Sequence, residues 1–156
     1  MRVKYLVSAC LAGEKCRYDG NSCAHQRIVE LVMRGEALPF CPEVAGGLGI
    51  PRERSEIYCA PDSPVRSGCS LKVITESGRD VTPNFLRGAE ETLKRVWKNK
   101  IECVILKSFS PSCGFGLIYD GSFSGRLVQG DGVTASLLHA NGVRILSEKD
   151  VDRFNL

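Results

Sequence analysis

The sequence lacks several features that would place a protein in a broad class. None of its apolar runs approaches the ~20 residues that span a membrane. The N-terminus, MRVKYLVSAC, is interrupted by charge, and its apolar run is too short for the core of a signal peptide. The net charge of +3 is too small to indicate nucleic acid as the main partner. We therefore expect a cytoplasmic protein without a membrane anchor.

Repeats and low-complexity tracts are also missing, so the 156 residues are most simply one domain with its own core. Short apolar segments flanked by breakers predict buried strands. They cover residues 3–9, 38–41, 101–107 and 143–147. Helical periodicity predicts helices over residues 25–35, 82–100 and 134–140. Strands that alternate with helices predict a three-layer α/β fold, Rossmann-like, whose mainly parallel sheet has helices on both faces.

The helix predicted over residues 82–100 has the clearest pattern. Thr82 is a good N-cap and Pro83 a good first-turn residue. Its apolar stripe consists of Phe85, Leu86, Ala89, Leu93, Val96 and Trp97. The preceding residues 51–80 are rich in Pro, Ser, Gly and charge, and SLKVITESGRDVT within them is typical of a strand, a Ser-Gly turn and a return strand. We expect this segment to be a hairpin or flap inserted in the single domain of residues 1–156.

Cysteine is abundant, with eight residues, but the paired C-x-x-C spacing of many structural zinc sites is absent. A reducing compartment disfavours disulfides, which favours metal-binding or redox roles for some of the thiols. Cys103 lies in an apolar run and is expected to pack in the core. Cys59 and Cys69 lie in a polar segment and receive no role, although a hairpin would bring them together.

Cys10, Cys41 and Cys113 follow the ends of three predicted strands. Ligands collect at the carboxyl ends of parallel strands, so we expect these thiols to meet at one edge of the sheet. Three dispersed thiolates suit an iron–sulfur cluster that keeps one iron free of protein ligands. Cys16 is the rival fourth ligand, because CLAGEKC keeps it near Cys10.

Thiolates also need stabilisation by backbone N–H groups or by cations. Arg17, Arg52 and Lys107 are the candidate cations. Tyr18 in RYDG would either stack on a planar ligand or simply pack. GDGVTASLL places glycines before a helix, which favours capping over anion binding.

Four motifs together resemble the thiouracil desulfidase family. They are SACLAGEKCRYDG, CPEVAGGLGIPRE, ILKSFSPSCG and IYDGSFSGRLVQGDGVTASLL, and they cover nearly the whole chain in the order of the family. The resemblance implies a [4Fe-4S] cluster held by Cys10, Cys41 and Cys113, with Cys16 outside the ligand set. It also implies a catalytic glutamate, Glu43.

The resemblance further implies a catalytic serine, for which Ser110 is the first choice and Ser112 the second. The implied reaction is hydrolysis of the C=S bond of a small thiolated pyrimidine, without net redox change. The substrate sulfur would bind the open iron, and Glu43 would accept a proton from the attacking water.

Two other functions remain open at this point. An iron–sulfur binding or sulfur-carrier protein would need the thiols but no base, and it would normally close the fourth iron position with a protein ligand. A dithiol redox protein would use Cys10 and Cys16. Glu43 and the two serines near the expected ligands favour the enzyme. His25 and His139 lie in helical patterns, and neither is expected to take part.

Overall fold

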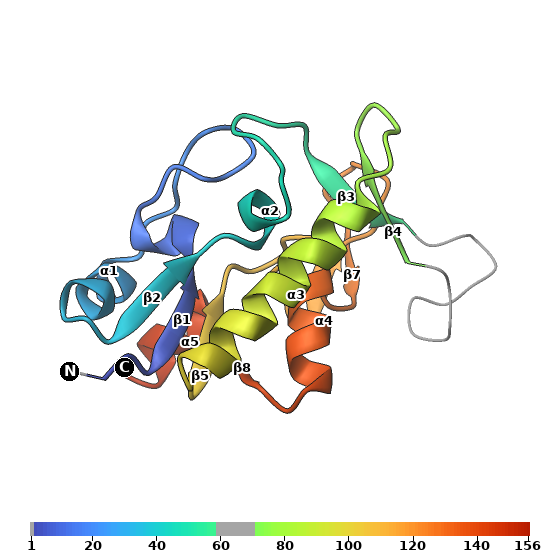
Figure 1. Cartoon of the computed structure of the whole chain (residues 1–156). Coiled ribbons are helices and arrows are strands. Elements are labelled where there is room, and N and C mark those ends of the chain that lie inside the picture. The colour runs from blue at the N-terminus through green and yellow to red at the C-terminus, as the bar shows by residue number, and fades with distance from the viewer. Residues whose placement is uncertain (1, 59–70) are drawn as a thin grey trace.

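The computed structural model describes residues 2–58 and 71–156 of the chain. A central sheet of four parallel strands has the order β2-β1-β5-β8 (Figure 1). The strands are β1 (Tyr5–Ser8), β2 (Ala37–Phe40), β5 (Cys103–Leu106) and β8 (Arg144–Ser147). Each strand lies within or beside a segment predicted from the sequence, although the observed strands are shorter.

Helices cover both faces of this sheet. On one face, Val7 and Ile105 pack in a cluster with Ile28 of α1 (Gln26–Met33) and Val151 of α5 (Glu148–Arg153). The alternate strand residues point the other way, because side chains along a strand face opposite sides. They pack against α3 (Thr82–Lys98) and α4 (Val133–Ala140), and their cluster contains Leu6, Val104, Val96 and Leu138. The predicted three-layer α/β class is therefore confirmed.

Several short elements were not predicted. They are the 3₁₀ helix η1 (Ala9–Ala12), the α-helices α2 (Pro42–Ala45) and α5, and the strands β3 (Ser55–Tyr58), β6 (Leu117–Tyr119) and β7 (Leu127–Gln129). The strand β4 (Lys72–Thr75) forms an antiparallel hairpin with β3. The return strand expected after the Ser-Gly turn is reduced to one bridge between Ile74 and Asp80. Cys59 and Cys69 lie outside the described residues.

Two expectations for α3 were wrong. Thr82 is the first helical residue, and its hydroxyl accepts a hydrogen bond from Val73 N at 2.9 Å. The N-cap is Val81, and Asp80 before it accepts a hydrogen bond from Thr82 N with its Oδ1 at 2.9 Å. Leu86 and Trp97 are 47% and 59% exposed. Each is one position beyond a buried residue, and a step of one residue turns a side chain by about 100° around a helix.

The short helix α2 lies directly against α3 at two glycines. A Cβ added to Gly88 would meet Pro42 O at 2.0 Å, and one added to Gly46 would meet Asn84 O at 2.0 Å. The Asn84 side chain also donates a hydrogen bond to Gly46 O at 2.9 Å. This approach of the two backbones fixes where α2 begins, which places Cys41 and Glu43.

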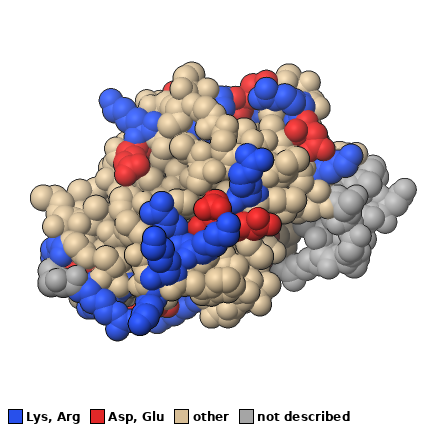
Figure 2. All heavy atoms as spheres, viewed as in Figure 1, with Lys and Arg blue, Asp and Glu red and all other residues tan. Residues whose placement is uncertain are grey.

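The face of the molecule shown in Figure 2 carries Lys and Arg in several groups, with Asp and Glu among some of them. Arg95 and Lys98 lie in the last turn of α3, where positive charge is favourable to the helix dipole. Within the described part of the chain, no helix combines the length and apolar character that crossing a membrane requires.

Candidate functional site

A cavity of about 260 Å³ opens at the carboxyl edge of the parallel sheet. Its wall contains residues from the segments that follow β1, β2 and β5. Cys10, Cys41 and Cys113 all line this cavity, as the spacing of the strands predicted. Cys16 lines it as well, so four thiols from distant parts of the chain share one space.

Each of the three predicted ligands is fixed by local structure in a segment that follows a strand. Cys10 lies in η1, which begins directly after β1. Cys41 is the N-cap of α2, and Pro42 occupies the first position of that helix. Cys113 is 4% exposed and lies in a tight turn where Gly114 N donates to Ser110 O at 2.8 Å.

The thiol of Cys16 interacts with those of Cys10 and Cys41. Hydrogen bonds from these two thiols lower the pKa of Cys16, and the nearby Arg52 lowers it further. The same hydrogen bonds, together with burial, raise the pKa of Cys10 and Cys41. Burial also raises the pKa of Cys113 to about 11. The cavity therefore has a compact thiol wall formed by Cys10, Cys16, Cys41 and Cys113.

One thiol near this wall was missed by the sequence analysis. Cys23 contacts Cys10, and the hydrogen bond from Cys10 lowers the pKa of Cys23 to about 7, with help from Lys107 and Arg17. The only available signal was that Cys23 follows Cys16 in the same loop. Cys103, by contrast, is 3% exposed and packs in the core away from the cavity, as predicted.

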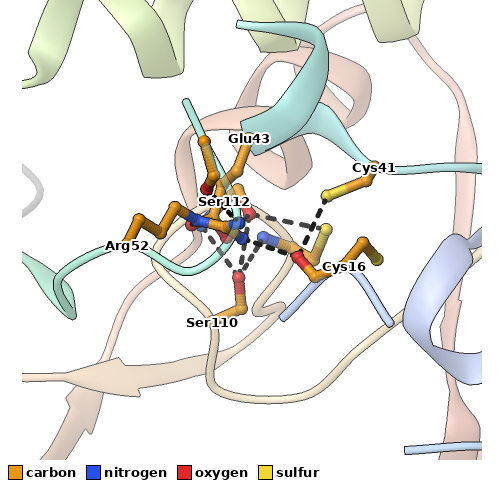
Figure 3. Close-up of polar contacts among 8 residues, drawn as sticks. Cys16, Cys41, Glu43, Arg52, Ser110 and Ser112 are labelled. Atoms are coloured by element: carbon orange, nitrogen blue, oxygen red, sulfur yellow. Dashed lines mark hydrogen bonds and ion pairs between the residues drawn. The ribbon is translucent and has the colours of Figure 1, made fainter. Parts of the chain in front are cut away.

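Glu43 lies in the first turn of α2 and its carboxylate is held from two sides (Figure 3). Arg52 Nε donates to Glu43 Oε1 at 3.2 Å. Ser112 Oγ donates to Glu43 Oε2 at 3.0 Å. The side chains of Glu43 and Arg52 are only 18% and 7% exposed, which makes this a largely buried ion pair.

Ser110 and Ser112 continue the hydrogen-bonded group. Their hydroxyl oxygens are 2.9 Å apart. A carboxylate only accepts hydrogen bonds, so Ser112 donates to Glu43 and accepts from Ser110. Ser110 Oγ in turn accepts from the backbone N–H groups of Ser112 at 3.1 Å and Cys113 at 3.0 Å. The structure thus brings the three predicted catalytic side chains into one chain of contacts.

The loop that carries these serines is supported by the start of α4. Pro111 O accepts from Val133 N at 2.8 Å, and Ser112 O accepts from the N–H groups of Thr134 and Ala135 at 2.9 and 3.1 Å. A Cβ added to Gly132 would lie 2.5 Å from the Ser112 carbonyl group. These N–H groups are satisfied by the loop, which agrees with the capping interpretation of GDGVTASLL and leaves them no role in binding an anion.

Another part of the lining is basic and aromatic and is named the aromatic wall; it consists of Arg17, Tyr18, Lys107, Phe109 and Tyr119. Arg17 lies 5.8 Å from the ring centroid of Tyr18. Lys107 Nζ is 3.3 Å from Oε1 of Glu148, which is the first residue of α5. All three predicted cations, Arg17, Arg52 and Lys107, therefore line the cavity. His25 and His139 are absent from its wall.

The thiol wall fits an iron–sulfur cluster better than a single ion. Among residues 2–58 and 71–156, no three or more His, Cys, Asp or Glu side chains form a group that could hold one metal ion. In a cluster each cysteine binds a different iron, so the thiols surround a larger group than a single ion. Thiolates from three strand ends around one cavity match this need, and thiolate sulfur is the ligand that iron–sulfur clusters select.

Comparison with known proteins agrees with the motifs. The chain is 44% identical over 147 residues to the uncharacterized protein YbbK of Bacillus subtilis (strain 168), and the match covers 94% of this chain and 97% of YbbK. It is also similar to the solved structure of the [4Fe-4S]-dependent thiouracil desulfidase TudS. The TM-score is 0.83 and the identity 42%, with 97% of this chain and 95% of TudS covered. The model of the family described as 2-thiouracil desulfurase matches residues 5–150, so the chain belongs to this family, as the motifs predicted.

Proposed function

We propose that this protein is a [4Fe-4S]-dependent desulfidase that hydrolyses the C=S bond of a thiolated pyrimidine such as thiouracil. Water supplies the oxygen of the new carbonyl group, and sulfur leaves as hydrosulfide, so no electrons are gained or lost. One observation carries the proposal: the thiol wall, Glu43 and Ser112 line the same cavity, and Glu43 and Ser112 are hydrogen-bonded (Figure 3). Family membership and the likeness to TudS support it.

Cys10, Cys41 and Cys113 are the proposed ligands. When bound, the cluster would supply an iron without a protein ligand, a Lewis acid suited to the soft sulfur of a thiocarbonyl. Glu43 is the proposed general base that takes a proton from the attacking water. Its carboxylate lies two residues beyond Cys41, so base and ligand are placed by the same helix start.

The two serines have different proposed tasks. Ser112, the second choice from the sequence, contacts Glu43 directly and holds the carboxylate with its hydroxyl. Ser110 acts one step further away, because its hydroxyl donates to Ser112 while its oxygen accepts two backbone N–H groups.

The reaction is placed in the cytoplasm, where thiols stay reduced. This is consistent with the six cysteines of the described segments, all of which are free. The substrate is a small thiolated pyrimidine, and the cavity lining contains aromatic rings, Tyr18 among them, on which such a ring can stack.

Anaerobic reconstitution tests the proposal. The protein should bind about four irons per chain and release sulfide from 2-thiouracil or 4-thiouracil. Glu43→Gln should keep the iron and lower the rate by about 10²–10⁴-fold, the usual contribution of a general base. A carrier protein would bind the iron and release no sulfide, and a fully active Glu43→Gln variant would show that another group is the base.

A further inference from the structure

We propose that Arg52 is a positioning residue for the reaction, which acts by fixing the orientation of the Glu43 carboxylate. The inference rests on the proposed function, because it assigns Arg52 a task only if Glu43 is the base. It is carried by the contacts of the Arg52 guanidinium with Glu43 and Cys16 of the cavity lining (Figure 3) and with Gly49 O in the loop after α2.

Every nitrogen of the guanidinium has a partner. Nε donates to Glu43 Oε1 at 3.2 Å, one terminal nitrogen donates to Gly49 O at 3.1 Å, and the other donates to Cys16 O at 2.9 Å. The backbone N of Arg52 also donates to Tyr18 O at 2.8 Å. Two of these acceptors, Gly49 O and Cys16 O, hold both terminal nitrogens of the planar group, so the position of Nε is set independently of Glu43.

Arg52 and Ser112 together determine the plane of the carboxylate. Arg52 holds Oε1, and Ser112 holds Oε2 at 3.0 Å. Each carboxylate oxygen can accept two hydrogen bonds, so each keeps one site for the attacking water. Without Arg52, Ser112 would be the remaining hydrogen-bond partner of the Glu43 carboxylate among residues 2–58 and 71–156, and the carboxylate could turn about the Cγ–Cδ bond. A displacement of about 1 Å at a reacting group can cost about 100-fold in rate.

A purely stabilising role explains these contacts less well. Buried ion pairs often add little net stability, because removing both charges from water offsets their attraction. Arg52 is nevertheless almost fully buried, with a side chain that is 7% exposed. Its bond to Cys16 O suggests one structural alternative, in which Arg52 only holds the loop that carries Cys16. That alternative predicts loss of iron when Arg52 is changed.

The test compares Arg52→Gln and Arg52→Lys in the full-length, reconstituted protein. Both variants should keep about four irons per chain and the visible absorption of the cluster. For Arg52→Gln, kcat should fall by about 100-fold while KM stays within about 3-fold. Arg52→Lys keeps the charge without the planar fork, so it should recover only part of the loss. Lys94→Gln, which breaks an exposed ion pair with Glu91 on α3, is the matched control and should leave both constants unchanged.

The double variant Glu43→Gln/Arg52→Gln separates this inference from the proposed function. If Arg52 acts through Glu43, the second substitution should cause no further loss in the Glu43→Gln background. If the rate losses of the two single variants multiply in the double variant, the inference is overturned and Glu43 remains the base. A fully active Arg52→Gln variant, or loss of iron from both Arg52 variants, would also overturn the inference. An active Glu43→Gln variant would instead overturn the base assignment, and this inference with it.

Discussion

The two walls of the cavity are built in different ways. In the thiol wall, Cys41 directly follows β2 and Cys10 lies two residues after β1, so the sheet sets the position of these two thiols, whereas Cys16 and Cys113 lie further along the loops. The aromatic wall takes its residues from loops and from β6: Arg17 and Tyr18 follow Cys16, Phe109 precedes the SPSC turn, and Tyr119 ends β6. Phe109 has a positive φ of 70°, a conformation that surrounding contacts must hold in place. We expect the thiol wall to hold the proposed cluster and the aromatic wall to contact the ligand.

The largest effect should come from the thiol wall. Cys113→Ser should reduce the iron content well below that of the wild type and lower activity by more than about 100-fold, because losing a ligand costs more than losing a residue that supports one. Iron analysis and sulfide release measure both. Cys103→Ser is the matched control, since Cys103 is equally buried but packs away from the cavity. Iron retained in Cys113→Ser would remove this residue from the ligand set.

The next largest effect should come from Gly132, which packs against the turn that carries Cys113. In Gly132→Ala the new methyl group would lie 2.5 Å from the Ser112 carbonyl, so the loop must move. Overpacking of this kind lowers the free energy of unfolding by about 1–3 kcal/mol, and each kcal/mol lowers Tm by about 2–4 °C for a chain of this size. Thermal unfolding measures the change. Gly49→Ala, where the nearest atom is 3.9 Å away, should leave Tm unchanged. Equal values for the two variants would contradict the close packing described here.

A smaller effect should follow from changes in the aromatic wall. Tyr18→Leu should raise KM for thiouracil by about 2–10-fold, the range expected for loss of one aromatic stacking contact, and should leave kcat and iron content unchanged. Steady-state kinetics separate the two constants. Tyr58→Leu is the control, because Tyr58 is 45% exposed and does not line the cavity. A fall in kcat with unchanged KM would show that this wall takes part in the chemistry after all.

The smallest effect should come from Cys16, although it lies in the thiol wall. Serine at this position can keep hydrogen bonds to Cys10 and Cys41, so Cys16→Ser should retain the iron and stay within about 2-fold of wild-type activity, as expected for a change below about 0.5 kcal/mol. Iron analysis decides the point. Loss of the cluster in this variant would make Cys16 a ligand and would change the ligand set proposed above.

The same contrast explains what could be predicted from the sequence. Strand ends are visible as apolar runs, and parallel strands bring their carboxyl ends together, so Cys10, Cys41 and Cys113 could be placed at one edge. Glu43, Ser110 and Ser112 were found through the family motifs rather than through periodicity. Membership of the family is confirmed by the family model.

The remaining features depend on contacts between distant segments. Nothing in the sequence around Arg52 indicates that its guanidinium reaches Gly49, Cys16 and Glu43 at once. The approach of Gly132 to Ser112 depends on how α4 meets the loop after β5. Leu86 and Trp97 were assigned to the buried stripe because an apolar pattern does not show which residues at its border a neighbouring helix covers.

The order of the segments along the chain has a consequence for biosynthesis. The proposed ligands lie at positions 10, 41 and 113, and the turn that carries the last of them rests on Gly132. A ribosome-bound chain that ends before this glycine has only part of the binding pocket. Insertion of the proposed cluster into a complete pocket therefore requires that synthesis has passed residue 132.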